Sequence, residues 1–230
     1  MEGLNKKYET ESLSLDLSGQ QFRLMRVTNT DQLYADLVAK GKEHADVEDE
    51  RIPYWADLWP SALALAMEVM DNQDIKAGTK VLEIGCGLGL PGIAAGMKGA
   101  SVILSDYMSE PLDFACINWR MNLQTEAQRA LLDWRKPDPA LAADVLLASD
   151  VAYERRSFEF LPHAFQTLVK PGGLILLTEP NRLMASEFFA RLPLKGFEVK
   201  SQNRTVTLHD RSHLISVYRI GDKSGALFGK

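Results

Sequence analysis

The chain contains little cysteine, since only Cys86 and Cys116 occur among its 230 residues. Two cysteines cannot build a disulfide framework, and neither lies in a CxxC pair or a His/Cys cluster of the kind that binds zinc. Long apolar runs are also missing. None approaches the roughly 18 residues that a membrane-spanning helix requires, and the first residues lack the apolar stretch of a signal peptide. We therefore expect a cytoplasmic protein with reduced thiols, no metal and no membrane partner.

Neither sign of charge dominates the chain, because 26 Lys and Arg residues stand against 31 Asp and Glu residues, a net charge of −5. A protein held mainly by nucleic-acid phosphates needs clustered basic charge, so we expect no nucleic-acid partner. Hydrophobic residues make up 46% of the chain, and a chain of this length can bury a sizeable core. The length predicts one domain with a modest extension.

The predicted extension covers residues 1–51 and is not expected to fold as an independent domain. Apolar and polar residues alternate from Leu13 to Leu17, and a turn at Gly19 leads into a second alternating stretch, so a β-hairpin is expected. Residues 30–39 should form a short helix. The charged run 40–51 is expected to be an exposed linker.

Residues 52–230 form the predicted main domain, in which strand-like and helical stretches alternate. That pattern predicts right-handed βαβ crossovers and a mainly parallel sheet. The last two strand-like stretches, 197–208 and 213–220, are joined by only a short link, which indicates antiparallel neighbours. The last strand should therefore run against the others. Earlier strands are expected at 80–84, 101–105, 129–132, 144–148 and 175–178.

A glycine-rich loop, Gly85-Cys-Gly-Leu-Gly89, follows the first of these strands and opens a helix, which is the context of a nucleotide-type loop. Glycines permit a tight turn and a close approach of the ligand. A dinucleotide fingerprint requires Gly or Ala three residues after Gly87, where this chain has Leu90. Glu83 lies just before the loop, where its carboxylate would repel a pyrophosphate but not a cationic ligand. Glu83 could also be a plain surface residue of the strand.

Asp106 ends the second strand of the main domain. Carboxylates at the end of that strand accept hydrogen bonds from ribose hydroxyls. A helix-capping or turn role for Asp106 is the alternative.

Three features together, residues Val81 to Gly92, Asp106 and the closing antiparallel hairpin, resemble the seven-strand S-adenosylmethionine-dependent methyltransferases. The resemblance covers roughly residues 52–220. It implies an α/β, Rossmann-like sheet of seven strands, mainly parallel with an antiparallel last strand, preceded here by the hairpin and helix. It also implies S-adenosyl-L-methionine as cofactor, with Asp133-Trp134 on the adenine side, although core packing also accounts for Trp134. The implied cofactor-binding residues are Trp59, Glu83, Gly85, Gly87, Gly89, Asp106, Tyr107, Asp133, Trp134 and Ser149.

Two further segments narrow the choice of methyltransferase. The aromatic-rich segment 53–61 is either a core plug or one wall of a cofactor pocket, and composition favours the plug. The second segment, 149–153, follows the fourth strand, at the sheet edge that lines the ligand crevice. Asp150 and Tyr153 would meet the methyl acceptor there; a turn residue and a buried aromatic are the alternative. Base-methylating enzymes often carry two prolines at the positions of Val151 and Ala152, which argues against a nucleic-acid substrate.

These two segments together resemble the family-16 protein-lysine methyltransferases. The resemblance implies a lysine of a protein substrate as acceptor, with Asp150 and Tyr153 shaping its entrance. Asp150 could orient the amine and receive a proton, so Asp150 and Tyr153 are the candidate catalytic residues. Tyr54 and Trp55, which could line an aromatic slot with Tyr153, are the candidate substrate-binding residues. A lysine has a free pKa of about 10.4, and a desolvated slot near a sulfonium would lower that pKa so that the amine could react.

Three other functions stay open. A small-molecule N-methyltransferase would share the same core. An NAD-dependent oxidoreductase is disfavoured by Leu90 and by the closing hairpin. The last is a non-catalytic cofactor-binding protein.

Overall fold

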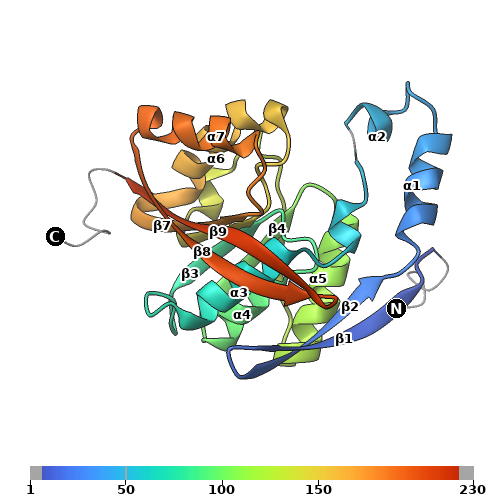
Figure 1. Cartoon of the computed structure of the whole chain (residues 1–230), viewed down its shortest axis with the longest axis horizontal. Coiled ribbons are helices and arrows are strands. Elements are labelled where there is room, and N and C mark those ends of the chain that lie inside the picture. The colour runs from blue at the N-terminus through green and yellow to red at the C-terminus, as the bar shows by residue number, and fades with distance from the viewer. Residues whose placement is uncertain (1–6, 50, 223–230) are drawn as a thin grey trace.

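The computed structural model describes residues 7–49 and 51–222 and contains a seven-stranded sheet (Figure 1). The strands of the sheet are β3 (Lys80–Ile84), β4 (Ser101–Asp106), β5 (Gln128–Leu131), β6 (Ala143–Ser149), β7 (Val169–Glu179), β8 (Phe197–Leu208) and β9 (Arg211–Asp222). Their order is β5-β4-β3-β6-β7-β9-β8. Hydrogen-bonded neighbours are parallel, except that β9 is antiparallel to both β7 and β8. The predicted fold class is therefore confirmed, including the reversed last strand.

Helices cover both faces of the sheet (Figure 1). One face carries α3 (Pro60–Asp71), α4 (Leu90–Met97) and α5 (Ser109–Leu123), and the other carries α6 (Leu161–Leu168) and α7 (Ala185–Arg191). Single-turn helices lie at η2 (Tyr54–Ala56), η3 (Pro139–Leu141), η4 (Arg155–Glu159) and η5 (Leu192–Lys195). These helices pack on the two faces of the sheet and not on its edges. In such a sheet, ligands bind at the carboxyl ends of the strands.

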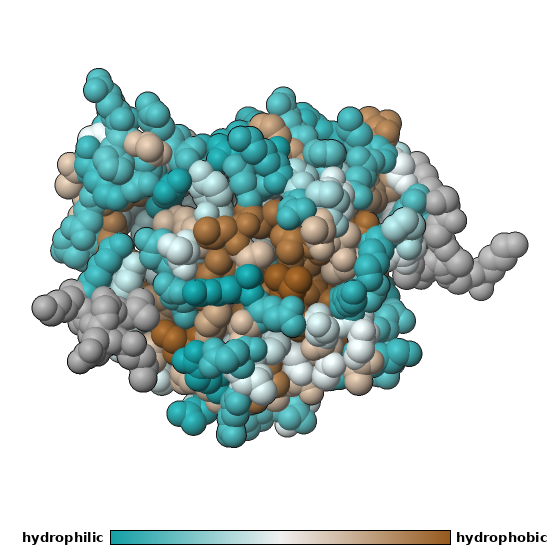
Figure 2. Space-filling view, turned by 180° about the vertical axis from the view of Figure 1, so that it is seen from behind, coloured by the Kyte–Doolittle hydropathy of each residue, from teal (hydrophilic) through white to brown (hydrophobic). Residues whose placement is uncertain are grey.

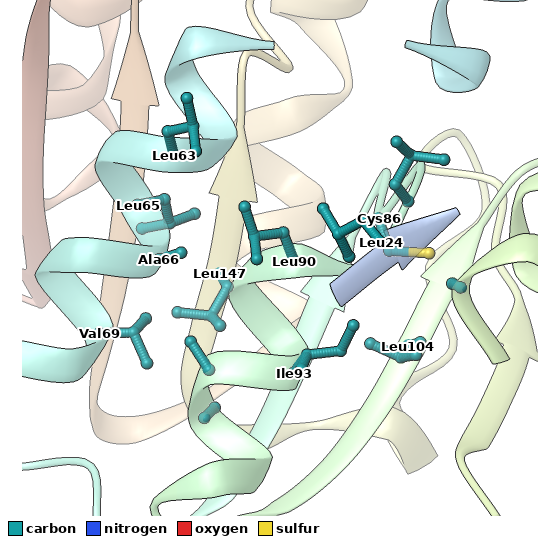
Figure 3. Packing of buried hydrophobic residues seen from close by; sticks show 14 of the residues in the cluster. Leu24, Leu63, Leu65, Ala66, Val69, Cys86, Leu90, Ile93, Leu104 and Leu147 are labelled. Carbon is teal, nitrogen blue, oxygen red and sulfur yellow. The ribbon is translucent and has the colours of Figure 1, made fainter. Parts of the chain in front are cut away.

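Two apolar clusters fill the space between the sheet and its helices. Val81 belongs to one cluster and the next residue, Leu82, to the other, because successive side chains of a strand point to opposite faces. In the first cluster, Leu65 of α3, Ile93 of α4 and Leu147 of β6 pack together (Figure 3). Buried apolar residues therefore fix both faces of β3, the strand that leads into the glycine loop.

The predicted hairpin is present as β1 (Thr10–Leu17) and β2 (Gln20–Val27), and the predicted helix as α1 (Thr30–Ala39). Two asparagines of α5 hold the hairpin against the main domain. Asn118 Oδ1 accepts from the Met25 amide (2.6 Å) and Asn118 Nδ2 donates to the Met25 carbonyl (3.1 Å), while Asn122 contacts Arg23 in the same way (2.9 and 2.7 Å). Phe22 of β2 is fully buried in the cluster that also contains α3. The hairpin thus shares its core with the main domain.

The charged run 40–51 differs from the plain exposed linker that was expected. It contains a one-turn helix, α2 (Ala45–Glu48). Asp49 and Arg51 line a cavity of the main domain, where their charged side chains have hydrogen-bond and ion-pair partners. Charge density alone could not predict this contact, because a solvated segment and an ion-paired segment have the same density of charged residues.

The surface opposite to that of Figure 1 carries apolar side chains near its centre, surrounded by hydrophilic ones (Figure 2). In the described residues, no helix is both long and apolar enough to cross a membrane.

Candidate active site

A cavity of about 580 Å³ lies at the carboxyl ends of β3, β4, β5 and β6, and Asp49 and residues between 51 and 62 also line it. Its volume is in the usual range for small-molecule sites, about 300–1,000 Å³. Except for Glu83, every residue predicted for the site lines this cavity: Tyr54, Trp55, Trp59, Gly85, Gly87, Gly89, Asp106, Tyr107, Asp133, Trp134, Ser149, Asp150 and Tyr153.

The glycine loop curves past the cavity in a conformation that favours glycine. Gly85, Gly87 and Gly89 have φ angles of +58°, +50° and +80°, values that L side chains rarely adopt. A side chain at Gly85 would also meet the Trp134 ring, because a Cβ there would lie 3.0 Å from Trp134 Cζ2. The next residue, Leu90, begins α4, and a proline occupies the first turn of that helix. This chain therefore has a helix start where a dinucleotide fingerprint has its last glycine.

Glu83 differs from the predicted cofactor contact, since it does not line the cavity and is fully buried behind the loop. Its Oε2 accepts a 2.9 Å hydrogen bond from the Gly92 amide, and Oε1 has no hydrogen-bond partner among the described residues. Burial raises the pKa of Glu83 to about 8. The side chain joins β3 to the first turn of α4 and so holds the loop in place from behind.

Among the acidic residues that line the cavity, Asp106 alone makes no ion pair within the described part of the chain. Its oxygens accept from the amides of Gly87 (3.1 Å) and Met108 (3.3 Å). Burial raises the pKa of Asp106 to about 6, against the opposing effect of these hydrogen bonds. A carboxylate that lacks a cation is free to accept hydrogen bonds from ligand hydroxyls.

Two guanidinium groups lie against the Tyr107 ring, with the Cζ of Arg51 5.1 Å and that of Arg135 5.2 Å from its centre. Its hydroxyl donates to Asp49 (2.6 Å) and accepts from Arg135 (3.0 Å) and Arg51 (3.3 Å). Arg135 also donates to Asp133 at 2.9 Å. This network ties the segment before the main domain to the loops after β4 and β5. Sequence reasoning missed Asp49, Arg51 and Arg135, and only their charge could have drawn attention to them.

On the side of the cavity after β5, Trp134 is half-buried. Its indole Nε1 is buried and has no hydrogen-bond partner within the described residues. Together with the contact to Gly85, this places the Trp134 ring at the loop, with a donor that nothing in the described chain satisfies.

Aromatic residues of the segment 53–61 also line the cavity. Tyr54 and Trp59 are 46% and 37% exposed, and their ring centres lie 6.1 Å apart. Tyr54 also faces Tyr153, at 5.9 Å. The expected core plug is therefore wrong for Tyr54 and Trp59, although Trp55 does pack on Phe114, at 5.4 Å. Composition could not separate the two roles, because an apolar pocket wall and a core use the same residue types.

Asp150 adopts a positive φ of 53° directly after β6 and pairs with the guanidinium of Arg182. Burial raises the pKa of Asp150, and Arg182 acts in the opposite direction. Burial likewise raises the pKa of the Tyr153 hydroxyl. Arg182 was not among the predicted residues. It follows the end of β7, so the rule that strand ends line the crevice could have found it.

Comparison with known proteins relates these features to a family. Residues 47–195 match the family described as lysine methyltransferase. The chain is 48% identical over 141 residues to the electron transfer flavoprotein beta subunit lysine methyltransferase of Xenopus laevis, covering 58% of this chain and 55% of that one. It is 38% identical over 149 residues to the human histone-arginine methyltransferase METTL23, covering 62% and 78%. The flavoprotein-methylating relative of Danio rerio is 32% identical over 134 residues, and the chain spans about half of its length.

Solved structures share the fold. The precorrin-6y C5,15-methyltransferase of Geobacter metallireducens matches with a TM-score of 0.58 at 14% identity, covering 70% of this chain and 89% of that one. A TehB-like S-adenosylmethionine-dependent methyltransferase of Corynebacterium glutamicum matches with a TM-score of 0.54 at 15% identity, covering 85% and 97%. The family match covers more than half of the chain and confirms the resemblance seen in its motifs: the chain belongs to the lysine methyltransferase family.

Proposed function

We propose that the chain transfers a methyl group from S-adenosyl-L-methionine to the side-chain nitrogen of a lysine in a protein substrate. One observation carries the proposal. A single cavity is lined both by the glycine loop with the unpaired carboxylate of Asp106 and by the aromatic pair Tyr54 and Tyr153 with Asp150. The first group suits the cofactor and the second suits an amine acceptor.

The residues at the cavity fit this cofactor. Asp106 would accept hydrogen bonds from the ribose hydroxyls, and the backbone from Gly85 to Gly89 would pass close to the methionine end. The unsatisfied Nε1 of Trp134 and its place beside the loop support an adenine-side role. When bound, S-adenosylmethionine supplies a methyl group that its sulfonium already activates. The protein then has to position the acceptor.

The acceptor must arrive as a neutral amine, because a protonated lysine has no lone pair to attack with. Tyr54 and Tyr153 would shield the amine from water, and desolvation lowers its pKa. The aromatic faces would also hold the methylated, cationic product. Asp150 would orient the amine and receive its proton directly or through water.

Lysine is favoured over arginine as acceptor by the ion pairs of the cavity wall. A guanidinium is bound best by carboxylates that offer two free oxygens. Among the described residues of the wall, Asp49 and Asp133 are already paired with Arg135, and Asp150 is paired with Arg182. Asp106, which is unpaired, is assigned here to the ribose.

The proposal includes three further points. Residues 1–51 form an extension of the domain 52–230, which the contacts of Asn118 with β2 support. The location is cytoplasmic, which the free thiols of Cys86 and Cys116 support. Nucleic acid is not a substrate, which the net charge of −5 supports.

The test is transfer of labelled methyl from S-adenosylmethionine into a cell extract, followed by identification of the labelled molecule and residue. We expect the label to be retained on dialysis, to become dialysable after protease digestion, and to be found on a lysine. The Asp106→Ala variant should give no label. Label in a dialysable compound would instead favour the small-molecule enzyme. No transfer to any acceptor would contradict the proposal.

A further inference from the structure

Two residues with left-handed backbone follow neighbouring strands at the cavity edge. Asp150 after β6 and Asn181 after β7 have φ angles of +53° and +64°. Asp and Asn tolerate this conformation better than most residues, and such positions cluster at functional sites. The Asp150 amide donates to the Thr178 carbonyl (2.8 Å), and Asn181 Nδ2 donates to the Leu214 carbonyl (2.8 Å). Both loops are thus held at fixed positions on the sheet.

Arg182, the residue after Asn181, joins these two loops. Its Nη1 donates to Oδ1 of Asp150, and its backbone amide donates to Oε1 of Glu179 at 2.7 Å. Asp150 and Arg182 both line the cavity. The second oxygen of Asp150, Oδ2, has no hydrogen-bond partner in the described part of the chain. The contact therefore fixes one oxygen of the carboxylate and leaves the other available.

The charges around Asp150 determine whether it can orient an amine. Burial favours the neutral acid, and the guanidinium of Arg182 favours the carboxylate. Glu179, the last residue of β7, is a second acidic group near Arg182; its Oε1 lies 4.0 Å from Arg182 Nη1. Tyr153 stays protonated, because burial raises its pKa. Without Arg182, Asp150 would face Glu179 with no cation between them and would take up a proton at higher pH.

We propose that Arg182 is a positioning residue for methyl transfer, which holds Oδ1 of Asp150 so that Oδ2 orients the acceptor amine. The inference rests on the proposed function, because that function gives Asp150 its acceptor. The guanidinium has a second effect, since a nearby positive charge disfavours a protonated acceptor. Arg182 thus favours both an ionised Asp150 and a neutral amine.

The experiment compares Arg182→Gln, Arg182→Lys and Asp150→Asn with the matched control Arg155→Gln, which removes an exposed arginine paired with Glu187. We expect Arg182→Gln to lower kcat/KM for the acceptor at least about tenfold, with the Kd of S-adenosylhomocysteine unchanged. The acidic limb of its pH profile should move to higher pH, and Arg182→Lys should restore part of the loss. Arg155→Gln should match wild type. In the Asp150→Asn background, Arg182→Gln should have little further effect.

Two results would overturn the inference: an unchanged kcat/KM and acidic limb in Arg182→Gln, or an equal loss from Arg182→Gln with and without Asp150. If the wild-type chain transfers no methyl at all, the proposed function fails separately. The contact is then tested by an NMR titration of the Asp150 carboxyl carbon. A higher pKa in Arg182→Gln than in wild type supports the positioning role, and an identical pKa contradicts it.

Discussion

The hydroxyl of Tyr107 donates a 2.6 Å hydrogen bond to Asp49, 58 positions earlier in the chain. Tyr107 follows Asp106, the residue that ends β4, whereas Asp49 follows α2 in the segment before the main domain. Arg135 completes the contact, since it lies 3.0 Å from the Tyr107 hydroxyl and 3.3 Å from Asp49. Asp49 and several residues from Arg51 to Trp59, all between α2 and α3, are therefore part of the cavity wall.

Tyr107→Phe removes these hydrogen bonds and keeps the ring contacts with the two guanidinium groups. We expect S-adenosylhomocysteine to bind about five- to tenfold more weakly, because a hydrogen bond to a charged group contributes about 1.5 kcal/mol and its loss frees a segment that lines the cavity. Calorimetric titration measures the change. The matched control is Tyr34→Phe, an exposed tyrosine of α1, which should bind as wild type does. Equal affinities in both variants would show that the contact plays no part in binding.

Asp106 should make cofactor binding depend on pH. Burial raises its pKa to about 6, and the ionised form is the one that accepts both ribose hydroxyls. Affinity for S-adenosylhomocysteine should therefore be constant above pH 7 and fall towards tenfold per pH unit below about 6. Asp106→Asn should bind weakly at every pH. A wild-type affinity that stays flat from pH 5 to 8 would contradict the assignment.

Glu83 should lower the stability of the fold as the pH rises. Its pKa is about 8 when folded and about 4.5 when exposed, so between these values the folded state binds a proton that the unfolded state has lost. The free energy of unfolding then falls with rising pH, by at most about 1.4 kcal/mol per pH unit. Glu83→Gln keeps an oxygen for the Gly92 amide and removes the titration. Denaturant unfolding from pH 5 to 8 should show the variant gaining stability relative to wild type as the pH rises. A constant difference would exclude this role.

Asn118 and Asn122 offer a matched test of how the hairpin is attached. Asn118 is fully buried and bonds both the Met25 backbone and the Leu88 carbonyl, whereas the contact of Asn122 with Arg23 is exposed. Asn118→Ala should cost about 2–3 kcal/mol, because buried polar groups are left unpaired. Water can replace Asn122, so Asn122→Ala should cost about 1 kcal/mol or less. Denaturant unfolding gives both values, and similar losses would mean that burial does not govern this interface.

Much of the fold could be predicted because its signals are local. The alternation of strand and helix, the glycine loop and the short link between the last two strands each lie within a few consecutive residues. Asp106 and Asp150 could be assigned to one sheet edge because each lies at the carboxyl end of a predicted parallel strand. Glu83 was predicted to contact the cofactor because it lies just before the glycine loop in the sequence. Sequence position does not show that its side chain points behind the loop and away from the cavity.

The residues that were missed act through contacts between distant parts of the chain. Arg182 meets Asp150 across 32 positions, and Arg135 meets Asp49 across 86. No period or motif reports such pairs, because they depend on how the loops are arranged around the cavity. Composition likewise cannot decide whether the aromatic segment 53–61 belongs to the cavity wall or to the hydrophobic core. The exposure of Tyr54 and Trp59 in the structure assigns these two residues to the wall.

The central claim is that this cavity binds S-adenosylmethionine, and its most direct test is calorimetric titration of the purified chain with S-adenosylhomocysteine and, separately, with NAD. We predict saturable binding of one S-adenosylhomocysteine per chain, at least about tenfold weaker in Asp106→Ala, and NAD binding at least about a hundredfold weaker than that of S-adenosylhomocysteine. No detectable heat with S-adenosylhomocysteine, or tighter binding of NAD, would contradict the claim.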